Sequence, residues 1–73
     1  MKGKIKNIVS DRNFGFIRAN GTEYFFHKQD FYGSDWDELI FDVQNGPRES
    51  IEVDFDVSAN SQKGPRAENV RRL

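Results

Sequence analysis

The dipeptide Asn20-Gly21 constrains the fold of this chain more than any other feature. Asn-Gly is the strongest short signal for a two-residue β-hairpin turn, because both residues tolerate the positive φ angles that such a turn requires. The segments on either side, residues 13–19 and 22–27, are rich in aromatic and β-branched residues, as strands are. The sequence therefore predicts two neighbouring antiparallel strands joined at this turn.

Three further strands follow from the same kind of pattern. Residues 2–9 and 66–73 have strand-like composition, and residues 51–57 alternate apolar and acidic side chains without interruption. A long loop, residues 28–50, separates the third strand from the fourth. Five short antiparallel strands with one long loop at this place are typical of an all-β fold, the small closed barrel of the OB type.

One helical turn is expected inside that loop. Ser34 followed by Asp37 has the spacing of a helix N-cap, and the apolar residues Leu39, Ile40 and Phe41, which we expect to be buried, come directly after it. A loop broken by Asn45-Gly46-Pro47 is expected to follow. Several acids lie in the same region, but they lack the glycine-centred spacing of a calcium loop. We interpret them as a solvated loop, with a weak cation site as the alternative.

The 73 residues are enough for one domain, residues 1–73, and for one small core. Cysteine is absent, which excludes disulfides and thiol chemistry, and a lone histidine, His27, does not favour a metal centre or a catalytic triad. We therefore expect no enzyme activity and no cofactor. The sequence holds no apolar run near the ~18 residues of a membrane span and no signal-peptide pattern. A soluble, cytoplasmic monomer is the default expectation.

Charge is distributed unevenly along the chain although the net charge is only −1. Residues 1–28 carry six basic and two acidic side chains. Residues 63–73 carry four basic side chains and one acidic side chain. Residues 29–62 carry one basic and nine acidic side chains. If the two ends pair in space, the molecule has one basic and one acidic face, and the basic face can steer an anionic partner.

Side chains alternate across a strand, so Phe14 and Phe16 share one face while Gly15 and Ile17 share the other. A glycine facing inward lets a small barrel bend, which favours Gly15 and Ile17 inside. The expected interior set is then Ile5, Ile8, Ile17, Tyr24, Phe26, Ile51, Val53, Phe55, Val57 and Val70. The rings left outside are Phe14, Phe16, Phe25 and His27.

Flat rings beside lysine and arginine form the kind of surface on which unstacked bases bind, with about 1–3 kcal/mol of stacking per base. The alternative is that the alternation is shifted by one residue and these rings are simply core. Periodicity alone leaves both interpretations open.

The motifs resemble those of bacterial cold-shock proteins over essentially the whole chain. RNFGFI at residues 12–17 resembles that family's first ribonucleoprotein motif, usually KGFGFI, and FFH at residues 25–27 resembles the second, usually VFVHF. KGPRAENV at residues 63–70 and GKIK at residues 3–6 match two further family segments in the same order and at the same spacing.

The resemblance implies a five-stranded barrel that binds single-stranded RNA or DNA, as an RNA chaperone or a regulator of transcription or translation. It implies stacking by Phe14, Phe16, Phe25 and His27. It places four cations beside the same surface: Lys6, Arg12, Lys63 and Arg66. Aligned without gaps from His27, Trp36 falls where the family has a stacking loop phenylalanine, and a ring packed against the barrel wall is the alternative.

Departures from the family pattern predict a reduced site. Asn7 replaces the first-strand tryptophan, Lys28 replaces a phenylalanine, Asn13 replaces a glycine, and about eight residues are added after Leu39. Two lost rings at about 1–3 kcal/mol each predict weaker binding or a shorter site, with Lys28 returning some phosphate attraction. These changes also favour a rival hypothesis, a protein-interaction module with weak or no nucleic-acid binding.

Overall fold

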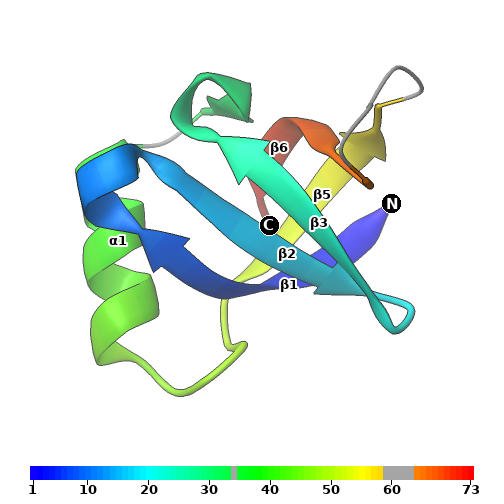
Figure 1. Ribbon diagram of the computed structural model, residues 1–73. Coiled ribbons are helices and arrows are strands. Elements are labelled where there is room, and N and C mark those ends of the chain that lie inside the picture. Colours follow the sequence, from blue (N-terminus) through cyan, green and yellow to red (C-terminus); the bar gives the residue numbers. More distant parts are fainter. Residues whose placement is uncertain (34, 59–63) are drawn as a thin grey trace.

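The computed structural model describes residues 1–33, 35–58 and 64–73, and within them the chain forms one curled β-sheet with one α-helix beside it (Figure 1). The helix is α1, Trp36–Asn45, and two short 3-10 turns are η1, Ser10–Arg12, and η2, Lys28–Asp30. The strands are β1 Lys2–Val9, β2 Phe14–Ala19, β3 Thr22–His27, β4 Phe31–Tyr32, β5 Glu52–Val57 and β6 Ala67–Arg72. None of the described residues forms a helix long and apolar enough to cross a membrane.

The sheet curls into a nearly closed barrel. Its strand order is β3-β2-β1-β5-β6-β4, with every pair antiparallel except the short parallel pair of β4 and β6. Strand β3 meets the start of β6, which closes the barrel. At this point Phe25 forms an isolated bridge to Arg66 and donates its backbone N–H to the Pro65 carbonyl at 3.0 Å. The predicted OB-type barrel is confirmed, and the five predicted strands are all present. The sixth, β4, is a two-residue addition inside the long loop.

The hairpin of β2 and β3 forms as its turn predicts. Asn20 and Gly21 have φ angles of 53° and 78°, and positive φ at both central residues is the mark of the turn that Asn-Gly favours. The turn fixes the register, so that Phe16 lies opposite Phe25 and Phe14 lies opposite His27. Every second residue of each strand therefore faces the same side of the barrel.

Gly15 faces inward, as predicted. A β-carbon at this position would lie 2.8 Å from the Asn7 carbonyl oxygen and 2.9 Å from the Phe26 ring, so no side chain fits. Ile17 and Phe26 on the same face are fully buried. The alternative of a register shifted by one residue is therefore wrong, and Phe14 and Phe16 belong to the outer face.

The interior set is largely as predicted, with two exceptions. Ile51 is only partly buried, and Val57 is 46% exposed. Val57 is the last residue of β5 and lies beyond an irregularity in the pairing with β6, between Asp54 and Asp56, so the alternation does not carry it inside. Five residues outside the predicted set complete the core: Ala19, Phe31, Trp36, Leu39 and Ala67.

The long loop contains a ten-residue helix rather than one helical turn. Its apolar residues recur at positions 36, 39, 40 and 43, the spacing of one helical face, and this stripe packs on the core. The N-cap is Asp35, whose side chain accepts from the Asp37 N–H at 2.9 Å, whereas Ser34 lies outside the described residues. Phe41 was expected to be buried, but it lies off the stripe and is 64% exposed.

Candidate nucleic-acid interface

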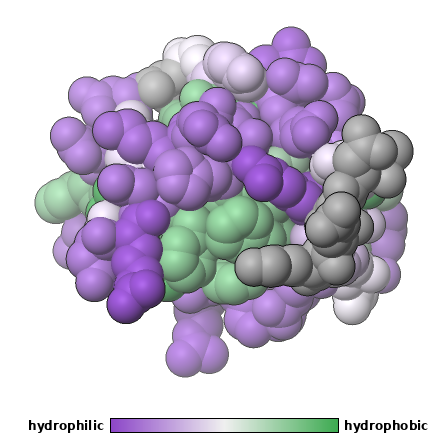
Figure 2. Space-filling view, turned by 45° about the horizontal axis from the view of Figure 1, so that its top comes forward, coloured by the Kyte–Doolittle hydropathy of each residue, from purple (hydrophilic) through white to green (hydrophobic). Residues whose placement is uncertain are grey.

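Three phenylalanine rings cluster on the outer face of β2 and β3. The centroids of Phe14 and Phe25 are 5.3 Å apart, those of Phe14 and Phe16 are 5.8 Å apart, and those of Phe16 and Phe25 are 6.1 Å apart. Each ring is half-buried, because it leans on its neighbours while one side remains open to solvent. Figure 2, which views the molecule from the side of these strands, shows an apolar patch bordered by hydrophilic residues.

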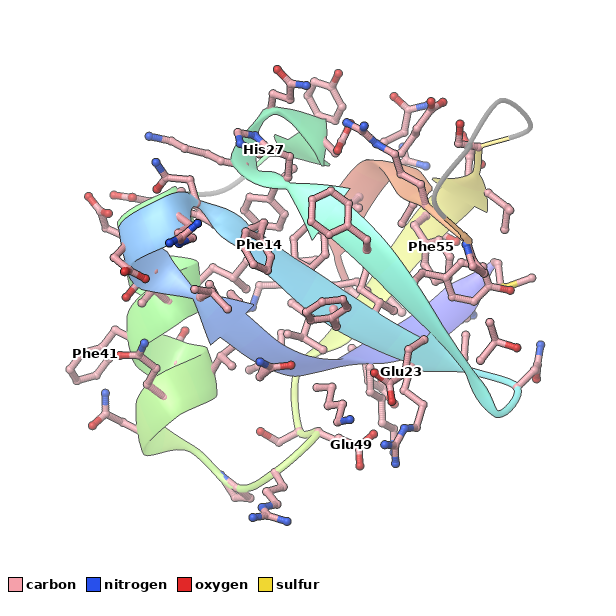
Figure 3. The ribbon with its side chains drawn as sticks, in the orientation of Figure 1. Phe14, Glu23, His27, Phe41, Glu49 and Phe55 are labelled. Atoms are coloured by element: carbon pink, nitrogen blue, oxygen red, sulfur yellow. The ribbon has the colours of Figure 1, made fainter. Side chains whose placement is uncertain are left out.

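His27 completes this surface, which we call the aromatic face: Phe14, Phe16, Phe25 and His27. The histidine pairs with Phe14 across the hairpin, and both lie at the same end of the two strands (Figure 3). The backbone N–H of His27 donates to Oδ2 of Asp30 at 2.9 Å. The ring Nδ1 of His27 accepts from the backbone N–H of Gln29 at 3.4 Å. These bonds form the cap of η2 and fix the backbone where β3 ends.

Arg66 borders the aromatic face from the other side of the barrel closure. Its guanidinium carbon lies 5.8 Å from the centre of the Phe25 ring, a distance at which a cation is attracted to the ring face. Its Nη2 also donates to Oδ2 of Asp30 at 3.0 Å, and Asp30 is only 9% exposed. Arg66 is therefore held in place by a buried carboxylate.

The other predicted cations differ in what they contact. Lys6 forms an ion pair with Glu23 at 2.9 Å. Arg12 and Lys28 are exposed and form no ion pair with any residue that the structure describes. They lie just before β2 and just after β3, where the Lys28 N–H donates to the Asn13 carbonyl at 2.8 Å. Lys63 lies outside the described residues.

Trp36 is not part of the aromatic face. The side chain is 7% exposed, and its ring centroid lies 6.0 Å from that of Phe26 and 5.9 Å from that of Phe31. It begins the apolar stripe of α1, which turns the ring toward the core. The structure thus corresponds to the alternative of a ring packed against the barrel wall rather than to a stacking position.

The substituted family positions lie next to the aromatic face, and neither carries a ring there. Asn7 is exposed on β1 and pairs with Phe16. Lys28 is exposed and follows His27 directly. The face therefore consists of three phenylalanines and one histidine, bordered by an amide and an ammonium group.

Two acids that contact the predicted cations were missed by reasoning from the sequence. Glu23 lies opposite Arg18, a pairing that the Asn20-Gly21 register already implies. Asp30 stands three residues after His27, the spacing at which an acid caps the turn. Both signals were present in the sequence. Among the described residues, no three His, Asp or Glu side chains converge as metal ligands would.

A small, nearly closed barrel with clustered rings on two outer strands defines a class of protein, the oligonucleotide-binding barrels. Within that class the chain belongs to the 'cold-shock' DNA-binding domain family, whose model matches residues 1–73. The resemblance of the motifs is thereby confirmed, and the family is one of nucleic-acid-binding domains. The chain is also 33% identical to the cold shock-like protein CspB of Bacillus cereus over 73 residues, which cover the whole of both chains.

Proposed function

We propose that this protein binds single-stranded RNA or DNA by stacking bases on the aromatic face. The observation that carries the proposal is the trio of half-exposed rings with centroids 5.3–6.1 Å apart, on strands whose inner face is fully packed. Single strands are the expected ligand because their bases can leave the stack and lie on a ring, at about 1–3 kcal/mol per base. Bases inside a duplex are not free to do so.

Phosphates are attracted mainly at one end of this surface. Arg12 and Lys28 are exposed cations beside Phe14 and His27, and they carry no ion pair with a described residue. Lys63, from the family-like segment, is proposed as a third. Because stacking tolerates every base, selectivity should be modest, and affinity should fall with salt.

We place the protein in the cytoplasm as a monomer that holds RNA unpaired, as an RNA chaperone or a regulator of transcription or translation, without catalysing a reaction. The aromatic face supports this role because it offers stacking surfaces and has cations beside it. Asn7 and Lys28 replace two rings beside this face, so binding should be weaker or cover fewer bases than in relatives that carry both. A nanomolar complex with a pyrimidine heptamer would contradict this weakening.

The test is fluorescence anisotropy of end-labelled oligo-dT and oligo-U at low and moderate salt. The label belongs on the oligonucleotide, because Trp36 is buried and is a poor reporter of the outer face. The Phe14→Ala/Phe25→Ala double variant should lose binding. Phe41→Ala is the matched control, since it removes an exposed ring from α1, away from the aromatic face (Figure 3).

Equal loss of binding in Phe41→Ala and the double variant would place the ligand elsewhere. Failure of the wild-type protein to bind any single strand at low salt, checked by calorimetry, would refute the proposal and favour the protein-interaction alternative.

A further inference from the structure

The outer face of the first three strands has two halves of different chemistry. On β2 the outward residues after Phe14 and Phe16 end with Arg18, and on β3 Glu23 precedes Phe25. Lys6 lies on the neighbouring strand β1. A single strand that runs along the rings past Phe16 therefore reaches a region of charged side chains rather than more rings.

The charges in that region are paired with one another. Lys6 Nζ lies 2.9 Å from Oε2 of Glu23, and Arg18 Nη2 lies 3.8 Å from the same oxygen. Arg18 Nε lies 3.5 Å from Oε1 of Glu49. We call these four residues the charge network: Lys6, Arg18, Glu23 and Glu49. Two cations and two carboxylates sum to zero, so the network offers no net attraction to a phosphate.

Glu23 stays ionised within the network. The hydrogen bond from Lys6 lowers the pKa of Glu23 below its ordinary value of 4.5, against an opposing effect of desolvation, and the charges of Lys6 and Arg18 lower it further. The carboxylate is therefore fully charged at neutral pH. A phosphate approaching Lys6 or Arg18 meets this negative charge as well.

Glu49 reaches the network from the loop between α1 and β5. Its φ of 53° is in the left-handed region, which is uncommon for a residue with a side chain. Two residues later, the Ile51 carbonyl accepts from the Ile5 N–H at 3.0 Å, which fixes this segment beside β1. Figure 3 shows Glu49 and Glu23 on the same side of the molecule, away from Phe14 and His27. The loop between α1 and β5 thus brings a carboxylate to the edge of the binding surface.

We infer that Glu23 and Glu49 withhold Lys6 and Arg18 from the phosphates, so that the binding footprint ends at Phe16. The inference rests on the proposed function and adds two residues that limit its extent. The strand is then held at the end marked by Phe14 and His27, where Arg12 and Lys28 carry no such partner in the part of the chain that the structure describes. A cation already paired with a carboxylate releases few counterions when a phosphate approaches, so it adds little to the salt dependence of binding.

The test measures the slope of log affinity against log salt for oligo-dT of increasing length. The variants are Glu49→Gln and Glu23→Gln/Glu49→Gln, and Glu38→Gln is the matched control. Glu38 is an exposed acid on α1 without an ion pair among the described residues, so its replacement changes the net charge by as much as Glu49→Gln does, and by half as much as the double variant. Thermal melts of all variants confirm that each is folded.

The double variant should steepen the slope by about 1.4, because each released cation adds about 0.7 for single strands. Glu49→Gln alone should steepen it by less, since Arg18 retains Glu23 at 3.8 Å. The double variant should also continue to gain affinity at oligonucleotide lengths where the wild type has reached its plateau. Glu38→Gln should leave both slope and plateau unchanged.

Two results would overturn this inference while leaving the proposed function intact. One is a slope of log affinity against log salt in the double variant equal to that of Glu38→Gln, and the other is weaker binding by the double variant than by the wild type at low salt. Absence of binding by the wild type would overturn the proposed function instead. The two failures are therefore distinguishable in one set of titrations.

Discussion

Arg66 and Asp30 form an ion pair with a distance of 3.0 Å between Nη2 and Oδ2, and this pair links the residue that precedes β6 to the turn that follows β3. The same Oδ2 accepts the His27 N–H. One buried carboxylate oxygen thus holds both a residue of the aromatic face and the cation beside Phe25.

Asp30→Asn should destabilise the protein and weaken binding together. The charged acceptor of both bonds is lost, and hydrogen bonds to charged groups contribute about 1.5–3 kcal/mol. Urea unfolding should show a lower midpoint with an unchanged slope. Asp11→Asn, at an exposed acid with no ion pair among the described residues, is the control and should leave the midpoint in place. Equal midpoints for the two variants would contradict the role of Asp30.

Asn7→Trp should strengthen binding to single strands. The residue is exposed and pairs with Phe16, so a ring here extends the aromatic face, and one additional stacked base contributes about 1–3 kcal/mol. Anisotropy with oligo-dT measures the change. Gln44→Trp, which adds the same ring on α1, should have no effect; if it strengthens binding as much, the gain is non-specific.

Gly15→Ala should destabilise the barrel more than Gly21→Ala does. At Gly15 the added carbon meets a backbone oxygen at 2.8 Å and a buried ring at 2.9 Å, and overpacking costs about 1–3 kcal/mol. Gly21 has open space around it, so only its φ of 78° opposes the change, at about 1–2 kcal/mol. Urea denaturation of both variants tests the order, and a smaller loss at Gly15 would argue that β2 is not pressed against β1.

Glu23 should titrate below its ordinary value, and Lys6→Met should move its pKa back up. The hydrogen bond from Lys6 is the largest cause of the lowering. Because the folded-state pKa is the lower one, the stabilising contribution of Glu23 is present above the unfolded value and is lost as the pH falls through the folded one. The effect on stability is small, since ion pairs of solvent-exposed side chains contribute little. Carbon-13 NMR of the side-chain carboxyl follows the titration, and an unchanged Glu23 curve in Lys6→Met would contradict the assignment.

Trp36→Ala should cost about 3–5 kcal/mol of unfolding free energy, because it removes a large buried ring from between Phe26 and Phe31. Phe41→Ala, an exposed ring of the same helix, should change it by about 0.5 kcal/mol or less. Thermal and urea unfolding measure both. Comparable losses would mean that Phe41 is packed in solution.

The hairpin and its outer rings could be predicted because short-range rules decide them. Asn20-Gly21 sets the register, and alternation across β2 and β3 then assigns each side chain to a face. The tight space around Gly15 agrees with its assignment to the inner face. Little beyond the neighbouring strand is needed to place these residues.

Helix α1 was predicted too short because only the signals near its two ends were used. A capping pattern and a loop signal at Asn45-Gly46-Pro47 were recognised, but the apolar spacing of the helix between them was not. Trp36 belongs to that spacing. An ungapped alignment with the family pattern placed it at a stacking position, whereas the helix turns it inward.

The ion pairs of Arg18 differ in how far the sequence predicts them. Arg18 opposite Glu23 follows from the hairpin register, but Arg18 beside Glu49 depends on how a segment 31 residues away in sequence folds back on β1. Long-range pairs of exposed charges contribute little free energy individually, so no sequence pattern specifies them.

The bridge between Phe25 and Arg66 joins the edge strand β3 to the start of β6, so the closure of the barrel passes through a residue of the binding surface. A base stacked on Phe25 therefore adds its binding free energy to the contact that keeps these two strands together, and ligand and fold stabilise each other at this point. The Phe25 amide, bonded to the Pro65 carbonyl, is the natural reporter. Its hydrogen-exchange rate reads the opening of the barrel and the occupancy of the site in a single measurement.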